Sequence, residues 1–295
     1  MNALMIMNPV SGKLSLIKHY KEIVQIFQDA GYNLDVRCTT GKGSAQEIIK
    51  DNAKNNDLII CCGGDGTLND IINGLMMYNI SMPIGYIPCG TTNDFASSLS
   101  ISKNMVTAAQ DIVSGKTHQV DVGKFGSTYF SYVASFGAFS QSSYSTPQNM
   151  KNTLGHFAYV LEGVKELPFI KPITLSVTTE TGENYSGEYA LGAIANSTSI
   201  GGIIKLDSAV VDMSDGEFEV LLVKYPKNFM DFNNILTSLQ TNDFENPSIN
   251  FFRAKEITVE SNEPLQWSLD GECFEAEKKE TIRNCQKAIN IILPN

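Results

Sequence analysis

The sequence is poor in basic side chains: its 295 residues include 22 Lys and Arg against 32 Asp and Glu, for a formal net charge of −10. Non-specific nucleic-acid binding requires a cationic surface that displaces counterions from phosphates. The shortage of basic residues therefore argues against a nucleic-acid partner. It also argues against tight electrostatic adhesion to an anionic membrane, while permitting a brief contact with one.

Cysteine pairs and long apolar runs are missing as well. None of the six cysteines forms a CxxC pair, and four lie in or beside apolar segments, where a thiol packs as a small hydrophobic group. Disulfides and a zinc site are therefore not expected. The apolar segment at residues 1–7 is short, lacks a basic leader and predicts a first strand instead of a signal peptide. No run reaches the length of a membrane span, so we expect a cytoplasmic protein.

Two common nucleotide-binding fingerprints are also absent, since neither GxxxxGK[ST] nor GxGxxG occurs. The chain has instead one stretch, residues 58–70 (LIICCGGDGTLND), in which an apolar run ends in three glycines around Asp65 and a helical pattern follows. A strand, a glycine turn and a helix in this order direct backbone N–H groups and a helix dipole at an anion. The stretch predicts a phosphate-binding turn; the alternative is an ordinary turn with an incidental aspartate.

Strands alternating with helices continue to about residue 120, which predicts a parallel sheet with right-handed crossovers. Four predicted strands end in donor-rich segments: NPVSGK (8–13), TTGKG (39–43), GGDGT (63–67) and CGTTNDFA (89–96). Ligands bind at the carboxyl ends of such strands, so we expect one shared phosphate site, although each segment alone is also ordinary turn chemistry. Residues 44–47 (SAQE) match a capping box that opens a helix.

From about residue 121, short strand-like segments separated by turns predict a β-sandwich. Among them are residues 128–134 and 288–293, and helical stripes at residues 154–164 and 228–239 interrupt the pattern. Core packing is the simpler interpretation of both stripes. The first stripe, with Phe136, Phe139 and Tyr144 upstream, is also compatible with an acyl-chain pocket. Residues 136–144 are the candidate for a membrane-contacting patch.

Two acidic turns in this second part carry possible chemistry. Residues 212–217 (DMSDGE) place three carboxylates before a predicted strand, which suits an oxygen-coordinated divalent cation as well as a plain acidic turn. Residues 267–272 (WSLDGE) place two carboxylates around a glycine. A phosphoryl acceptor hydroxyl needs a base that takes its proton, and a carboxylate serves in many kinases. A hairpin containing Asp-Gly, however, needs no function at all.

The segments NPVSGK, GGDGTLND and GTTNDFA, in this order, make the chain resemble the diacylglycerol-kinase-type lipid kinases, in particular their soluble bacterial branch, over its whole length. GGDGT alone also occurs in NAD kinases, whereas GTTNDFA is more characteristic of lipid kinases. The resemblance implies an α/β nucleotide-binding domain of the NAD-kinase and diacylglycerol-kinase type in residues 1–120. It further implies a β-sandwich lipid-substrate domain in residues 121–295, whose final segment returns to the first domain, and a cleft between the two domains.

The resemblance also implies an ATP- and Mg²⁺-dependent kinase that phosphorylates a lipid hydroxyl, with diacylglycerol, converted to phosphatidic acid, as the first expectation. The residues that would contact ATP all lie in the donor-rich strand ends. They are Asn8, Pro9, Val10, Ser11, Gly12, Thr39, Gly63, Gly64, Asp65, Gly66, Thr67, Leu68, Asn69 and Thr91.

Carboxylates carry the remaining implied roles. Asp65, which also counts as catalytic, would organise Mg²⁺ and water near the phosphates together with Asp94 and Asp121. A second, structural Mg²⁺ would be held at Asp212, Asp215 and Glu217, through the Asp215 side chain and the backbone carbonyls of the other two. The DGE segment would supply the catalytic base, with Asp270 preferred over Glu272.

The chain departs from the family pattern in three places, one of which is residues 207–208 (DS), where a proline is common. Asp70 stands where glutamate is usual, which keeps the carboxylate but shortens its reach. Residues 201–203 (GGI) stand where three glycines are usual. These departures leave the loop shapes and the acceptor lipid open.

Two other functions remain open at this stage. An NAD kinase or another small-molecule kinase would share the phosphate-binding turn, and a non-catalytic lipid- or nucleotide-binding regulator would share the fold. The expected partners are a lipid alcohol and, transiently, a membrane surface that a cytoplasmic, peripheral protein visits. A homodimer is left open, and the acceptor lipid is not identified.

Overall fold

The structure is a computed structural model that describes residues 1–11, 15–137, 171–200, 204–205 and 211–295. It divides into two compact units: unit 1 comprises Met1–Val122 and Gln286–Asn295, and unit 2 comprises Gly123–Cys285. Within the described ranges, no helix has both the length and the hydropathy that crossing a membrane requires.

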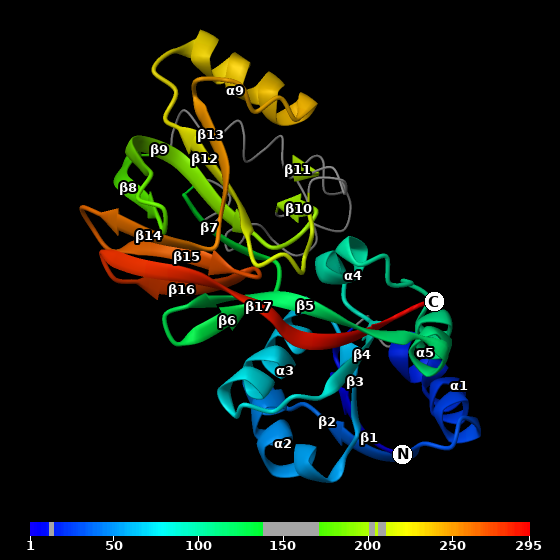
Figure 1. The fold of residues 1–295 in the computed structure, drawn as a ribbon. Coiled ribbons are helices and arrows are strands. Elements are labelled where there is room, and N and C mark those ends of the chain that lie inside the picture. The colour runs from blue at the N-terminus through cyan, green and yellow to red at the C-terminus, as the bar shows by residue number, and fades with distance from the viewer. Residues whose placement is uncertain (12–14, 138–170, 201–203, 206–210) are drawn as a thin grey trace. The chain divides into compact units, whose positions relative to one another are not determined.

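Unit 1 contains a parallel sheet flanked by helices (Figure 1). Its order along the chain is β1 (Asn2–Met7), α1 (Ser15–Asp29), β2 (Asn33–Cys38), α2 (Ser44–Asn52), a 3₁₀ turn (Ala53–Asn55), β3 (Leu58–Gly63), α3 (Asp65–Met77), β4 (Pro83–Pro88), α4 (Asp94–Ser98) and α5 (Met105–Ser114). Strands β4, β3, β1 and β2 lie side by side and run parallel, which confirms the predicted sheet.

Buried apolar side chains cover both faces of this sheet. On one face, Met5 of β1 and Cys62 of β3 pack in a cluster with Phe27 of α1 and Ile112 of α5. Cys61 is equally buried but, as the neighbour of Cys62 along a strand, points to the opposite face. Figure 1 shows α1 and α5 on one side of the sheet and α2 and α3 on the other. The prediction that these cysteines pack as small hydrophobic groups is therefore confirmed.

One local prediction for unit 1 is wrong. The expected capping box at residues 44–47 would make Ser44 the N-cap of α2, but α2 follows Gly43, which has a left-handed conformation (φ 77°) and no side-chain cap. Ser44 Oγ instead accepts the Thr40 N–H (3.1 Å). The Gly43 N–H is bound to Asp70 Oδ2 (2.8 Å), so a residue of α3 fixes the start of α2.

The described part of unit 2 consists mainly of antiparallel strands. They are β6 (Thr128–Phe130), β7 (Val133–Gly137), β8 (Ile173–Thr179), β9 (Asn184–Ala195), β10 (Ser199–Ile200), β11 (Ile204–Lys205), β12 (Phe218–Lys224), β13 (Ile249–Ala254), β14 (Glu256–Ser261), β15 (Leu265–Leu269) and β16 (Glu272–Ala276), with helix α9 (Phe229–Thr241) between β12 and β13. Strands pair in the order β16-β15-β7-β9-β8-β14, and β12 pairs with both β9 and β13. The strand-rich architecture confirms the predicted β-sandwich class, and α9 confirms the predicted helix at residues 228–239.

Aromatic side chains form the centre of unit 2. Trp267 lies between Phe125 and Phe136, with ring centroids 4.8 Å away on each side. Phe136 is fully buried in this cluster, so the prediction that it belongs to an exposed membrane patch is wrong. Phe139, Tyr144 and the predicted helix at residues 154–164 lie outside the described residues.

Two long strands belong to both units: β5 (Lys116–Phe125) and β17 (Lys279–Leu293). The first part of β17 pairs antiparallel with β14, and its last part pairs parallel with β4, through Asn290 and Ile291. The segment 288–293, predicted as a strand and expected to return to the first domain, extends the parallel sheet of unit 1.

Candidate active-site residues

The described members of the predicted phosphate site lie at or just beyond the carboxyl ends of β1, β2, β3 and β4, while Gly12 lies outside the described residues. The strand register fixes this edge: Met7 is opposite Cys38 on one side and Cys62 on the other, and Gly63 is opposite Pro88. Parallel strands that end together present their following loops at one edge of the sheet. The structure thus brings the four donor-rich segments to the same edge.

Asn8 ties the first of these segments to the glycine turn. Its backbone N–H donates to the Cys62 carbonyl (2.9 Å), and its side-chain amide donates to Thr67 Oγ1 (3.1 Å). Its side-chain oxygen accepts the Val10 N–H (3.1 Å), which shapes the turn after β1. Thr39, at the end of β2, donates its N–H to the Met7 carbonyl (2.8 Å). Both segments are therefore fixed by backbone contacts at the sheet edge.

The glycine turn is shaped by a close approach of two loops. A Cβ on Gly64 would lie 3.1 Å from Gly90 Cα, and one on Gly90 would lie 2.7 Å from Gly64 Cα. Gly66 differs, because a Cβ there would meet nothing within 4 Å. Helix α3 begins directly after Gly64, and no described side chain caps it. The first N–H groups of a helix lack partners within the helix, so this turn combines open space with backbone donors.

Asn93 shapes the loop after β4. It has a left-handed conformation (φ 54°), and its side-chain oxygen accepts the Gly90 N–H (2.9 Å) while its amide donates to the Gly90 carbonyl (3.0 Å). Asparagine tolerates positive φ better than most residues. Asn93 belongs to the GTTNDFA segment, but no local sequence pattern indicates that it shapes this loop. The side chain of Thr91, one of the predicted ATP contacts, is exposed beside it.

Asp65 joins the glycine turn to the loop after β4. Its Oδ2 accepts the Asp94 N–H (3.1 Å) and its Oδ1 accepts the Phe95 N–H (3.3 Å) at the start of α4. Asp121 is fully buried, and its Oδ1 accepts the Lys287 N–H (2.6 Å). Both carboxylates are thus bound to backbone donors of unit 1. Asp94, the third member of the predicted magnesium group, is half-buried.

Asp270 is held by four hydrogen bonds within unit 2. Its Oδ2 accepts the backbone N–H (2.6 Å) and the hydroxyl (2.7 Å) of Ser131, and its Oδ1 accepts the N–H groups of Tyr132 and Val133 (3.0 Å each). These donors interrupt the predicted strand at residues 128–134 and divide it into β6 and β7. Ser131 lies 139 positions from Asp270, so no local pattern indicates the contact.

The DGE segment is a tight turn between β15 and β16. Asp270 and Gly271 both have positive φ (49° and 86°), as the Asp-Gly pair of a two-residue hairpin turn requires. Burial raises the pKa of the Asp270 carboxyl above its ordinary value, although the four hydrogen bonds oppose this shift. Glu272 is the first residue of β16, opposite Leu269, and is exposed.

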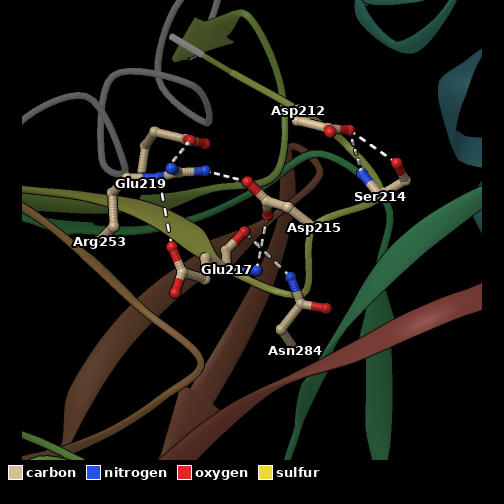
Figure 2. Close-up of polar contacts among 7 residues, drawn as sticks. All are labelled: Asp212, Ser214, Asp215, Glu217, Glu219, Arg253 and Asn284. Carbon is tan, nitrogen blue, oxygen red and sulfur yellow. Dashed lines mark hydrogen bonds and ion pairs between the residues drawn. The ribbon is translucent and has the colours of Figure 1, made fainter.

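Residues 212–217 form a hydrogen-bonded acidic turn beside Arg253 (Figure 2). Asp212 Oδ1 accepts the N–H and hydroxyl of Ser214. Asp215 Oδ1 accepts the Glu217 N–H (2.9 Å), and its Oδ2 accepts an N–H of the Arg253 guanidinium. The Glu217 carbonyl accepts the side-chain amide of Asn284 (3.1 Å).

The oxygens of this turn fit a guanidinium better than the predicted divalent cation. Each predicted ligand oxygen already accepts a protein donor, since the Asp212 carbonyl also accepts the Asp215 N–H (3.4 Å). Among the described residues, no group of three or more carboxylate, histidine or cysteine side chains is arranged to hold a metal ion. Sequence analysis missed Arg253, which lies 38 positions from Asp215.

Two family models match this chain, one in each half of the sequence. The family model of the diacylglycerol kinase catalytic domain matches residues 2–125. The model of the YegS C-terminal NAD kinase beta sandwich-like domain matches residues 134–293. The diacylglycerol kinase of Bacillus subtilis (strain 168) is 33% identical over 297 residues, which cover 99% of this chain and 96% of that protein.

A second relative and a solved structure also match over nearly the full length of the chain. A diacylglycerol kinase of Staphylococcus saprophyticus is 31% identical over 296 residues, covering 99% of this chain and 95% of that protein. The crystal structure of a diacylglycerol kinase from Bacillus anthracis str. Sterne matches with a TM-score of 0.82 at 26% identity, over 99% of this chain and 96% of that chain. The likeness extends over the whole of both units.

Proposed function

This chain belongs to the diacylglycerol kinase family, and we propose that it transfers the γ-phosphoryl group of ATP to the free hydroxyl of a diacylglycerol, which yields phosphatidic acid. One observation in the structure carries the proposal furthest. Hydrogen bonds from Asn8 to Thr67 and from the α4 backbone to Asp65 tie three strand-end segments into one pre-shaped edge. Phosphoryl transfer depends almost entirely on positioning and electrostatic stabilisation, for which such an edge is suited.

The phosphates of ATP would bind where α3 begins. The open space at Gly66 lets a phosphate approach the backbone, and the uncapped start of α3 offers N–H donors and the positive end of its dipole. Asn8, Ser11, Thr39 and Thr91 would add side-chain donors. The remaining predicted contacts, which lie in the segments 9–12 and 63–69, would approach the phosphates through backbone atoms.

Mg²⁺ would neutralise charge on the transferring phosphoryl group. The oxygens of Asp65 and Asp121 are bound to backbone N–H groups, so these residues suit an indirect part, holding the loops and ordering water around the ion. Asp94, which follows Asn93 at the start of α4, would act beside them. Asp65 is therefore proposed as a positioning residue.

We assign the base to Glu272 and a positioning function to Asp270, which reverses the preference drawn from the sequence. A base must use an oxygen lone pair to take the proton, and both Asp270 oxygens already accept two hydrogen bonds each. Glu272, two residues later, begins β16 and is exposed. Asp270 would fix the turn from which Glu272 projects.

The acceptor is proposed from the printed names of the relatives, and a direct assay tests it. Purified protein is incubated with γ-labelled ATP, Mg²⁺ and a panel of lipid alcohols in mixed micelles, with NAD as a non-lipid acceptor. The proposal predicts label in the product of diacylglycerol. Label in another lipid alone would overturn the acceptor, and label in NAD alone would overturn the lipid kinase. A peripheral contact with the membrane follows from a lipid acceptor, whereas a homodimer stays a prediction.

A further inference from the structure

The cluster around Arg253 lies outside the proposed reaction and has an arrangement that the reaction does not explain. Glu219 of β12 and Arg253 of β13 are directly opposite each other in the antiparallel pair of strands. The register of these strands therefore fixes the position of the Arg253 backbone, from which the side chain extends. From there it reaches the turn at residues 212–217, and Figure 2 shows it surrounded by the carboxylates of Asp215, Glu217 and Glu219.

Three carboxylates lie close enough to the guanidinium to compensate its positive charge. It donates to Asp215, and its Nε lies 3.6 Å from Glu217 Oε2 and 3.5 Å from Glu219 Oε1. Partial burial opposes the positive charge, but the three carboxylates outweigh it and raise the pKa of Arg253 further. A planar guanidinium with several N–H groups can bind more than one carboxylate at once.

The burial of Glu219 also favours a cation at this place. Its exposed fraction is 1%, and its Oε1 has no hydrogen-bond donor in the described part of the chain. A buried carboxylate oxygen without a donor is costly unless a positive charge lies beside it. The nearest described cation is Arg253, which opposes the rise of the Glu219 pKa to about 7 that burial causes, so the arginine favours the charged carboxylate.

We propose that the Arg253 guanidinium is the resident cation of the turn at residues 212–217 and holds it in the place of the divalent metal ion expected from the sequence. The guanidinium binds the same carboxylate, Asp215, that a metal would need. The side-chain amide of Asn284 binds the Glu217 carbonyl that would be another ligand. The turn is then ordered by the chain itself.

Thermal unfolding of the nucleotide-free protein, with a chelator or with excess Mg²⁺, tests this. The wild-type protein should melt at the same temperature in both conditions. Arg253→Gln should lower the melting temperature in chelator by on the order of 4 °C, and Mg²⁺ should restore part of the loss, because the freed carboxylates then accept the ion. Arg283→Gln is the control, since the described ion pair of Arg283 on β17 is with Glu256 of β14 and not with a carboxylate of the turn at residues 212–217. It should show little change and no response to Mg²⁺.

A second measurement keeps the proposal testable if Arg253→Gln does not fold. Calorimetric titration of nucleotide-free wild-type protein with Mg²⁺ should match that of Asp215→Asn, because no ion is bound at Asp215. A wild-type site for Mg²⁺ that Asp215→Asn abolishes would overturn the proposal. So would an Arg253→Gln protein that is as stable in chelator as the wild type.

Discussion

Three of the carboxylates in the proposed reaction, Asp65, Asp270 and Glu272, differ in burial and in the hydrogen bonds that the structure gives them. Asp65 accepts two backbone N–H groups, and Asp270 accepts three together with a hydroxyl. Hydrogen bonds to charged groups contribute about 1.5–3 kcal/mol each, and a buried donor left without its acceptor costs a similar amount. These two side chains therefore stabilise the protein as well as its site, whereas Glu272 lies exposed at the start of β16.

Glu272→Gln and Asp270→Asn separate these functions. Glu272→Gln should lower turnover by roughly 10²–10⁴-fold, the usual contribution of a general base, and change the melting temperature little, because its side chain is exposed. Asp270→Asn should lower the free energy of unfolding by about 2–3 kcal/mol, because an amide NH₂ would face backbone N–H donors. Kinetics and thermal unfolding of both variants check this, with Glu275→Gln on the exposed side of β16 as control. The assignment fails if Asp270→Asn is inactive at full stability while Glu272→Gln stays active.

The reactivity of the buried thiols Cys61, Cys62 and Cys89 tests the packing of unit 1. Burial raises the pKa of Cys89 to about 12, and burial also raises the pKa values of Cys61 and Cys62. At about pH 8 these thiols should stay protonated and resist alkylation in the folded protein. The exposed Cys38 and Cys273 should react with iodoacetamide, as mass spectrometry of digested peptides would show. Rapid labelling of Cys62 in folded protein would contradict the packing described here.

The pKa direction also fixes how these thiols affect stability. Because the pKa of Cys89 is higher in the folded state, its thiol ionises first in the unfolded chain as pH rises above about 8.5. The free energy of unfolding should therefore fall as pH rises from there towards 12, the folded pKa. Below that window, Cys89 adds no pH dependence.

At the scale of elements, the loops of unit 1 are held by side chains that cross from one element to another. Asp65 of α3 binds the start of α4, and Asp70 of α3 binds the N–H of Gly43 at the start of α2. Helix α3 thus fixes two of the loops at the phosphate edge. The shorter reach of Asp70, compared with the usual glutamate, is sufficient for this contact.

Asp65→Ala should disconnect α4 from the glycine turn. Losing a helix cap costs about 1 kcal/mol, so the protein should fold with a slightly lower melting temperature, while turnover should be lost because the loop after β4 is no longer positioned. Asp51→Ala on the exposed face of α2 is the stability control. Wild-type turnover in Asp65→Ala would show that this connection is not needed.

Local patterns predicted the elements of both units but not the contacts between distant segments. Alternation of apolar runs and helical stripes suffices for the parallel sheet, because both follow from residues close in sequence. The break between β6 and β7 depends on Asp270, more than 130 residues away, and the position of Gly43 before α2 depends on Asp70. Phe136 was misplaced for the same reason, since its partner Trp267 lies on a distant strand. The glycine turn was predictable because its chemistry is local.

At the scale of the whole molecule, β17 makes the last ten residues part of unit 1. Ile291 pairs with β4 and is fully buried, and the Lys287 N–H binds the buried Asp121. The sheet that carries the phosphate edge is therefore complete only when the end of the chain has been added.

Truncation after Cys285 should therefore destabilise unit 1 selectively. Removing the end of β17 exposes the edge of β4 and leaves Asp121 without the Lys287 N–H. Limited proteolysis should then cleave within residues 1–122 faster than in the full chain, and ATP binding should be lost. Truncation after Leu293 keeps the whole of β17 and is the control. Equal protease resistance of both truncated forms would contradict this function of β17.

Formation of phosphatidic acid tests the central claim most directly. Wild-type protein, Glu272→Gln and Glu275→Gln are each incubated with γ-labelled ATP, Mg²⁺ and diacylglycerol in mixed micelles, and the labelled lipid is identified. We predict labelled phosphatidic acid from the wild type and from Glu275→Gln, and a loss of roughly 10²-fold or more for Glu272→Gln. Absence of labelled lipid from folded wild-type protein that binds ATP would contradict the account. Equal amounts of labelled lipid from the wild type and the two variants would contradict it as well.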